Sequence, residues 1–188
     1  MIDEFRKRLR EGDVENFVAA RSSNLFYLLN IYNLSGILVS KPDETFLITS
    51  KFYKYTAEKL DLETKIYSSG EEKEEILESL DFDGEVLSDS PEALNDYVDS
   101  DKSDIIKEMR ETKTDWEVKK IRKASQVSSR AMKSLENNLS PDKTEWELAA
   151  SADNLIRKSG CYNAFETIAH ARALEPHRSP ENRKVKNE

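Results

Sequence analysis

Short apolar runs alternate with helical patterns up to about residue 106, and this alternation limits the possible fold more than any other feature of the sequence. Apolar runs predict strands at 16–20, 36–39, 45–49, 63–67, 84–87 and 105–106. Helical spacing predicts helices at 2–11, 52–60, 71–80 and 91–98. A further short helix is predicted to begin at an N-cap among Ser22, Ser23 and Asn24. Interleaved strands and helices pack in layers, so this part of the chain is expected to form an α/β domain.

A different pattern begins near Met109, with fewer strand signals and two long helical stretches. Thr114 with Glu117 forms a capping-box pattern, and the helix that follows is expected to end near Asn138. A second capping box, at 144–147, opens another helix, which Gly160 is expected to end as the C′ residue. The stretch 164–169 predicts a strand.

The first of these long helices carries its apolar residues along one face. The predicted face consists of Val118, Ile121, Ala124, Val127 or Ser128, Ala131 and Leu135. Two such helices and one strand cannot bury their apolar faces on each other alone. We therefore expect a further layer to be supplied beyond Glu188 or by a partner.

Charge and composition exclude several classes of function. Charged residues make up 35% of the chain and the net charge is -8, so nucleic acid is not expected as a partner. The basic run 119–123 is interpreted as the solvated face of a helix. The single cysteine, Cys161, allows no intrachain disulfide and is interpreted as a packing residue in a cytoplasmic protein. No export signal or membrane-spanning stretch is evident, so no membrane partner is expected.

The second part of the chain resembles the opening of the pita-bread metallopeptidase fold, which creatinase, prolidase, aminopeptidase P and methionine aminopeptidase share. The matching stretches are 110–117, Ile121 to Ala124 (IRKA), 140–148, 159–161, 164–168, the pair Pro176-His177 and 179–185. Residues 24–47 are similar to the N-terminal domain of the prolidase and creatinase branch, which methionine aminopeptidases lack. The resemblance implies a domain with a mixed sheet and flanking helices at 1–110, followed by an incomplete α+β pita-bread domain at 111–188.

The resemblance also implies a chemistry. Members of the family bind two divalent metal ions of the Mn, Co or Zn type through two Asp, one His and two Glu, and the first Asp is expected just beyond Glu188. No cofactor and no complete catalytic set is therefore expected within this chain. His177, from the family's Pro-His pair, is the one active-site residue implied here, as a substrate-binding group. The alternative interpretation is a histidine on a surface loop.

Two departures from the family concern this region. The loop 169–175 lacks the glycine common in relatives, and Asp142-Lys143 replaces a glycine turn. Three potential metal ligands lie close together in the sequence, at His170, Glu175 and His177. Their spacing matches no established zinc pattern, so they are interpreted as unrelated surface residues rather than as a metal site.

Two functions remain open at this point. The resemblance implies a metal-dependent Xaa-Pro dipeptidase or aminopeptidase, which hydrolyses the bond before proline in peptides and acts as a homodimer; this chain would be inactive alone. The alternative is a non-catalytic peptide-binding or dimerisation module of the same fold.

Overall fold

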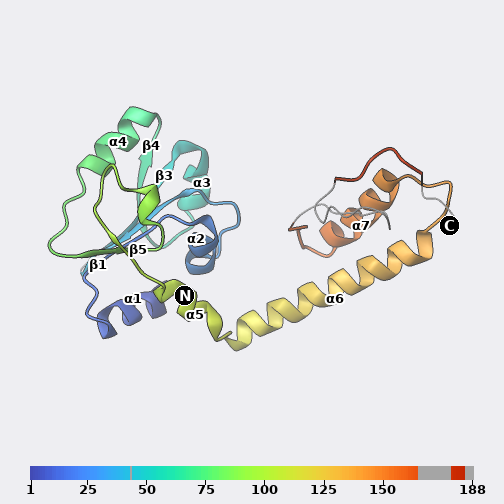
Figure 1. The fold of residues 1–188 in the computed structure, drawn as a ribbon, viewed down its shortest axis with the longest axis horizontal. Coiled ribbons are helices and arrows are strands. Elements are labelled where there is room, and N and C mark those ends of the chain that lie inside the picture. The colour runs from blue at the N-terminus through green and yellow to red at the C-terminus, as the bar shows by residue number, and fades with distance from the viewer. Residues whose placement is uncertain (43, 165–178, 185–188) are drawn as a thin grey trace. The chain divides into compact units, whose positions relative to one another are not determined.

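The computed structural model describes residues 1–42, 44–164 and 179–184. The chain forms two compact units, Met1–Thr112 and Lys113–Glu188, which are described separately below (Figure 1).

The first unit is built on a sheet of six strands in the order β4-β3-β2-β1-β5-β6. The strands are β1 (Asn16–Ala19), β2 (Gly36–Ser40), β3 (Thr45–Ser50), β4 (Glu63–Tyr67), β5 (Val86–Ser88) and β6 (Asp101–Lys102). The helices are α1 (Ile2–Glu11), α2 (Ser22–Leu29), η1 (Lys51–Tyr53), α3 (Lys54–Ala57), α4 (Gly70–Glu78), η2 (Pro91–Ala93) and α5 (Ile105–Glu111). Strand β2 is antiparallel to both of its neighbours, whereas the other pairs are parallel. The predicted α/β class with a mixed sheet is confirmed.

Burial on both faces of the sheet explains why helices lie on both sides of it. All four residues of β1 are buried, and the side chains of its three apolar residues divide between two clusters. Phe17 and Ala19 pack with residues of α1, α2 and α5, whereas Val18 packs with Phe46 of β3 and Leu77 of α4. Successive side chains of a strand point to opposite faces, so a strand this apolar must be covered twice.

Strands β2 and β3, which follow each other in the chain, form an antiparallel hairpin. Val39 lies opposite Phe46, and the turn between the strands is closed by the N–H of Lys41, which donates to the carbonyl of Glu44 at 2.8 Å. At the other end, a Cβ on Gly36 would lie 2.6 Å from the carbonyl oxygen of Ile48, so this close approach of the two strands requires glycine.

Three local predictions in the first unit are wrong. The expected helix at 91–98 is reduced to η2, after which the chain continues in turns. Residues 105–106 begin helix α5 rather than forming a strand, because Ile106 and Met109 are buried at helical spacing. None of Ser22, Ser23 and Asn24 caps α2; its N-cap residue is Arg21, whose side chain does not cap.

A distant carboxylate holds the chain that enters α2. Asp89, only 5% exposed, accepts hydrogen bonds from the N–H of Ala20 at 2.8 Å and from the N–H of Arg21 at 3.4 Å. Its other oxygen accepts from Nδ2 of Asn24 at 2.8 Å. Oδ1 of Asn24 in turn accepts from Nη1 of Arg110 on α5 at 2.9 Å, so the network joins the ends of β5, α2 and α5.

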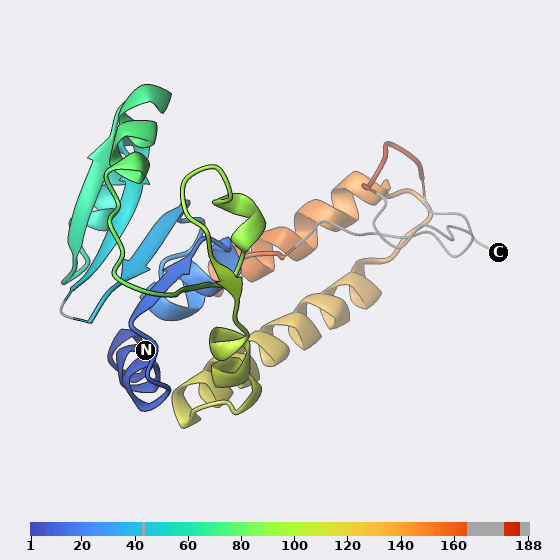
Figure 2. The same ribbon diagram turned by 60° about the vertical axis from the view of Figure 1, so that its left-hand side comes forward.

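The second unit contains α6 (Asp115–Asn138) and α7 (Glu145–Lys158), which lie side by side (Figure 2). Both predicted capping boxes are confirmed: Thr114 pairs with Glu117, and Thr144 pairs with Glu147. Gly160, with φ +69°, follows the C-cap residue Ser159, as predicted for C′. The strand predicted at 164–169 falls almost entirely outside the described residues.

The apolar face predicted for α6 is covered over only part of its length. Val127 and Ala131 are buried, whereas Ile121 is 55% exposed. Met132, close to this face, is 59% exposed. In the described part of the second unit, Ile121 and Met132 of α6 are therefore open to solvent. The strand that the expectation also included lies outside the described residues.

Replacing Asp89 by alanine is expected to destabilise the first unit by about 3 kcal/mol, because the N–H groups of Ala20 and Arg21 and the buried side chain of Asn24 lose their acceptor together. The measurement is urea unfolding followed by circular dichroism. Asp99→Ala, at an exposed position, is the matched control and should leave the unfolding midpoint unchanged. Equal midpoints for the two variants would contradict the stabilising role assigned to Asp89.

The second capping box predicts a pH dependence. The backbone N–H and the hydroxyl of Thr144 donate to the carboxylate of Glu147 and lower the pKa of this residue below its ordinary value. A carboxyl with a lowered folded-state pKa stabilises the fold above its unfolded pKa, and this contribution is lost as the pH falls through the folded-state pKa. Glu147→Gln should therefore unfold more readily than the parent at pH 7, and the difference should shrink in acid.

Thermal unfolding followed by circular dichroism at several pH values measures this difference. Glu136→Gln, an exposed change near the end of α6, controls for the loss of one charge. A stability difference between Glu147→Gln and the parent that stays constant down to pH 2 would contradict the assigned role.

Candidate functional site

The predicted substrate-binding residue, His177, lies outside the described residues, as do His170 and Glu175. The chain is described again from Ser179 to Lys184, immediately after the Pro176-His177 pair. This short segment is the described part of the chain nearest in sequence to His177. It is held against the first turn of α7.

The centre of this contact is a buried carboxylate. Glu145, the first residue of α7, has a side chain only 4% exposed. Its Oε1 accepts from Nε of Arg183 at 3.1 Å and from Nη2 at 2.8 Å, and its Oε2 accepts from the N–H of Glu181 at 3.0 Å. Both oxygens are thus satisfied by the segment that follows the Pro-His pair.

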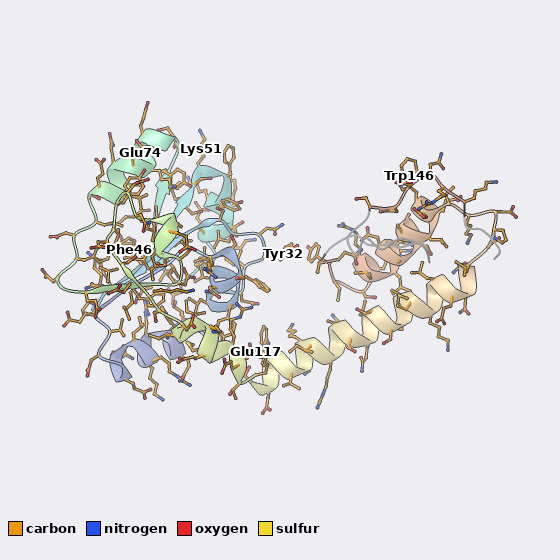
Figure 3. All side chains as sticks on the ribbon, in the orientation of Figure 1. Tyr32, Phe46, Lys51, Glu74, Glu117 and Trp146 are labelled. Atoms are coloured by element: carbon orange, nitrogen blue, oxygen red, sulfur yellow. The ribbon has the colours of Figure 1, made fainter. Side chains whose placement is uncertain are left out.

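Backbone contacts and a second side chain complete the attachment. The N–H of Glu145 donates to the carbonyl of Arg183 at 3.0 Å, and Thr144 forms an antiparallel bridge with Lys184. Nε1 of Trp146 donates to the carbonyl of Pro180 at 2.7 Å; Figure 3 labels this tryptophan on α7. We call the attachment of Pro180–Lys184 to residues 144–146 the α7 clamp.

Helix geometry makes the start of α7 suited to this role. The first N–H groups of a helix have no partner within the helix, and the carbonyl of Arg183 satisfies that of Glu145. The partial positive charge of the helix N-terminus also favours a carboxylate there. A buried carboxylate that lost Arg183 would remain desolvated without a counter-ion, which is strongly unfavourable. The clamp is therefore a strongly held contact.

The sequence contained only part of this information. The capping-box pattern predicted Thr144 and Glu147, but Glu145 and Arg183 are 38 residues apart, and no local pattern links them. Trp146 is 56% exposed, so its clearest contact is the hydrogen bond to Pro180 rather than burial.

Other candidate features are placed as follows. The residues of the basic run 119–123 are all exposed on α6, and Cys161 is partly buried near the end of α7. Among the described residues no three His, Cys, Asp or Glu side chains come together as a possible metal site. Within the same part of the chain, no helix is both long and apolar enough to cross a membrane.

Comparison with known proteins finds peptidases that match almost the whole chain. The model of metallopeptidase family M24 matches residues 119–188. An uncharacterized peptidase of Methanocaldococcus jannaschii is 30% identical over 98% of this chain and 54% of its own length. The Xaa-Pro dipeptidase of Pyrococcus furiosus is 26% identical over 94% of this chain and 54% of its own length. The chain therefore spans about half the length of these curated relatives.

Solved structures establish the fold. The X-Pro aminopeptidase from Thermotoga maritima matches with a TM-score of 0.80 and 20% identity, covering 99% of this chain and 58% of that one. The prolidase from Pyrococcus horikoshii matches with a TM-score of 0.75 and 19% identity, covering 98% of this chain and 57% of that one. Over nearly its whole length, the chain resembles the N-terminal part of a pita-bread metallopeptidase of the prolidase kind.

Proposed function

We propose that this chain is the N-terminal part of a metal-dependent peptidase of the Xaa-Pro dipeptidase or aminopeptidase type, which hydrolyses the peptide bond preceding proline. The observation that carries the proposal is the extent of the similarity: curated peptidases match 94% to 98% of the chain, well beyond the residues matched by the family model. Methionine aminopeptidases lack an N-terminal domain of this kind, so a match that includes the first unit favours the prolidase branch.

The proposal divides the work between two domains. Residues 1–110 form the N-terminal domain, which helps to shape access of substrate, and residues 111–188 begin the catalytic domain. His177 binds the substrate or its intermediate, a role that suits an imidazole because it can donate to a developing oxyanion near neutral pH. The whole protein acts as a cytoplasmic homodimer on proline-containing peptides.

The two metal ions of the family do not fit the described residues. Among these residues no group of three or more potential ligands comes together, and the resemblance assigns the first ligating Asp to a position beyond Glu188. We therefore assign no described residue as a metal ligand and derive no catalytic step through the metals. The 188 residues on their own are proposed to be inactive.

A non-catalytic module is the second candidate function. It is favoured by the exposed apolar side chains of α6, because Ile121 and Met132 are more than half exposed, whereas Val127 and Ala131 of the same helix are buried. A peptide-binding or dimerisation module would use such a stripe directly, whereas a peptidase would cover it with the rest of its catalytic domain.

Cleavage assays distinguish the two functions. The 188-residue chain, supplied with Mn²⁺ or Co²⁺, should show no turnover of Xaa-Pro dipeptides. The protein isolated from its native source should cleave these substrates, lose activity in EDTA and regain it when Mn²⁺ or Co²⁺ is added back. Dipeptides with alanine in place of proline serve as the control for specificity.

Two results would contradict the proposal. EDTA-sensitive turnover by the 188-residue chain would show that its own residues bind the metals. If the protein isolated from its native source binds proline-containing peptides but does not cleave them, the non-catalytic module is favoured.

A further inference from the structure

Helix α6 carries a row of positive side chains along one exposed side. Between Val118 and Leu135 the sequence contains no Asp or Glu. Because an α-helix turns by about 100° per residue, several cations of this stretch fall within an arc of about 100°. We call them the basic stripe; they are Lys119, Arg122, Lys123, Arg130 and Lys133. All of them are exposed, whereas Val127 and Ala131, on another side of the helix, are buried.

The cations of the basic stripe lack the partners that cations have on other helices. On α7, Nε of Arg157 lies 2.6 Å from the carboxylate of Asp153, and α1 also carries ion pairs at i,i+3 and i,i+4 spacing. Across the described residues, no carboxylate forms an ion pair with the basic stripe. Like charges three or four residues apart repel each other along a helix. An acidic surface laid against α6 would therefore stabilise it.

The first unit carries an acidic surface of this kind on α4. Leu77 is buried in the core, whereas the carboxylates of α4 point away from it; Figure 3 labels Glu74. Partial burial raises the pKa of the Tyr97 hydroxyl, and the nearby carboxylates of Glu74, Asp96 and Glu78 raise this pKa further. Side chains from α4 and from the turns after η2 thus gather on one surface. We call it the acidic face; its exposed carboxylates belong to Glu71, Glu74, Glu75, Glu78 and Asp96.

We propose that the basic stripe binds the acidic face of a second copy of this chain, in a symmetric pair that makes the contact twice. In a two-fold pair, the stripe of each copy meets the face of the other, so both surfaces of both copies are compensated. The inference names the contact of the proposed homodimer, and it rests on that part of the proposed function alone.

Charge and length both favour a second copy as the partner. The net charge of -8 makes two copies repel each other in most orientations, so the orientation that joins the stripe to the face is the attractive one. Lys119 and Lys133 lie about 21 Å apart along α6, which is enough to span α4, a helix of about 13 Å. Nucleic acid is a poorer partner, because the rest of this acidic chain would repel its phosphates.

Charge reversal on separate chains tests the contact. One variant of the 188-residue chain carries Arg122→Glu with Arg130→Glu, and a second carries Glu74→Lys with Glu78→Lys. Each variant alone places like charges across the contact, so the Kd of its dimer should rise about tenfold or more above that of the parent. An equimolar mixture of the two should recover the dimer, because both contacts of the mixed pair again join opposite charges. Sedimentation velocity at about 0.15 M salt measures the Kd values.

A matched control separates the contact from the change in net charge. Lys51→Glu with Lys59→Glu, at exposed positions of the first unit, changes the net charge as much as the α6 variant does and should leave the Kd nearly unchanged. Recovery in the mixture also shows that both reversed variants are folded, which circular dichroism checks independently.

Each contrary outcome identifies what has failed. A parent that dimerises, with reversed variants that dimerise equally well, would overturn the contact and leave the homodimer standing. Reversed variants that stay monomeric when mixed would also overturn the contact. A parent that stays monomeric would overturn both the contact and the homodimer, and would leave nucleic acid, tested with labelled duplex DNA, or the rest of a longer chain to cover the stripe. The peptidase activity is tested separately by the cleavage assays.

Discussion

Burial of β1 on both faces is the constraint on which the architecture of the first unit depends. Phe17 and Ala19 require cover on one side of the sheet and Val18 requires it on the other, so a single helical layer would leave one set in water. Helices α1, α2 and α5 meet the first requirement, and α4 with the chain around Leu94 and Val98 meets the second. Phe46, labelled in Figure 3, belongs to the second cluster.

Each unit also depends on one buried carboxylate that joins distant parts of the chain. In the first unit Asp89 binds the start of α2 and, through Asn24, the Arg110 side chain of α5. In the second unit Glu145 binds Arg183 and the amide of Glu181. Burying a carboxylate is favourable only when its oxygens are satisfied, so each of these residues determines where its partner segment can lie.

Local patterns in the sequence predicted local structure well. The two capping boxes, strands β2 and β3 and the end of α7 at Gly160 all depend on residues within a few positions of one another, and all were predicted correctly. The stretch 105–106 was misassigned because two β-branched residues suggest a strand, whereas burial of Ile106 with Met109 favours a helix. Asp89 and Glu145 act over 65 and 38 residues, respectively, and no periodicity in the sequence reports on such contacts. His177 was identified only through the family's Pro-His pair, and its setting lies outside the described residues.

The first unit is an α/β unit with helices on both faces of its sheet, whereas helix α6 of the second unit still exposes apolar residues. We propose that the chain works as part of a longer peptidase, and the intact mass of the protein isolated from its source tests this proposal most directly. We expect a mass well above 21.6 kDa, in keeping with curated relatives of which this chain spans about half. A mass that matches 188 residues would contradict it and would leave a binding or dimerisation module as the function to be tested.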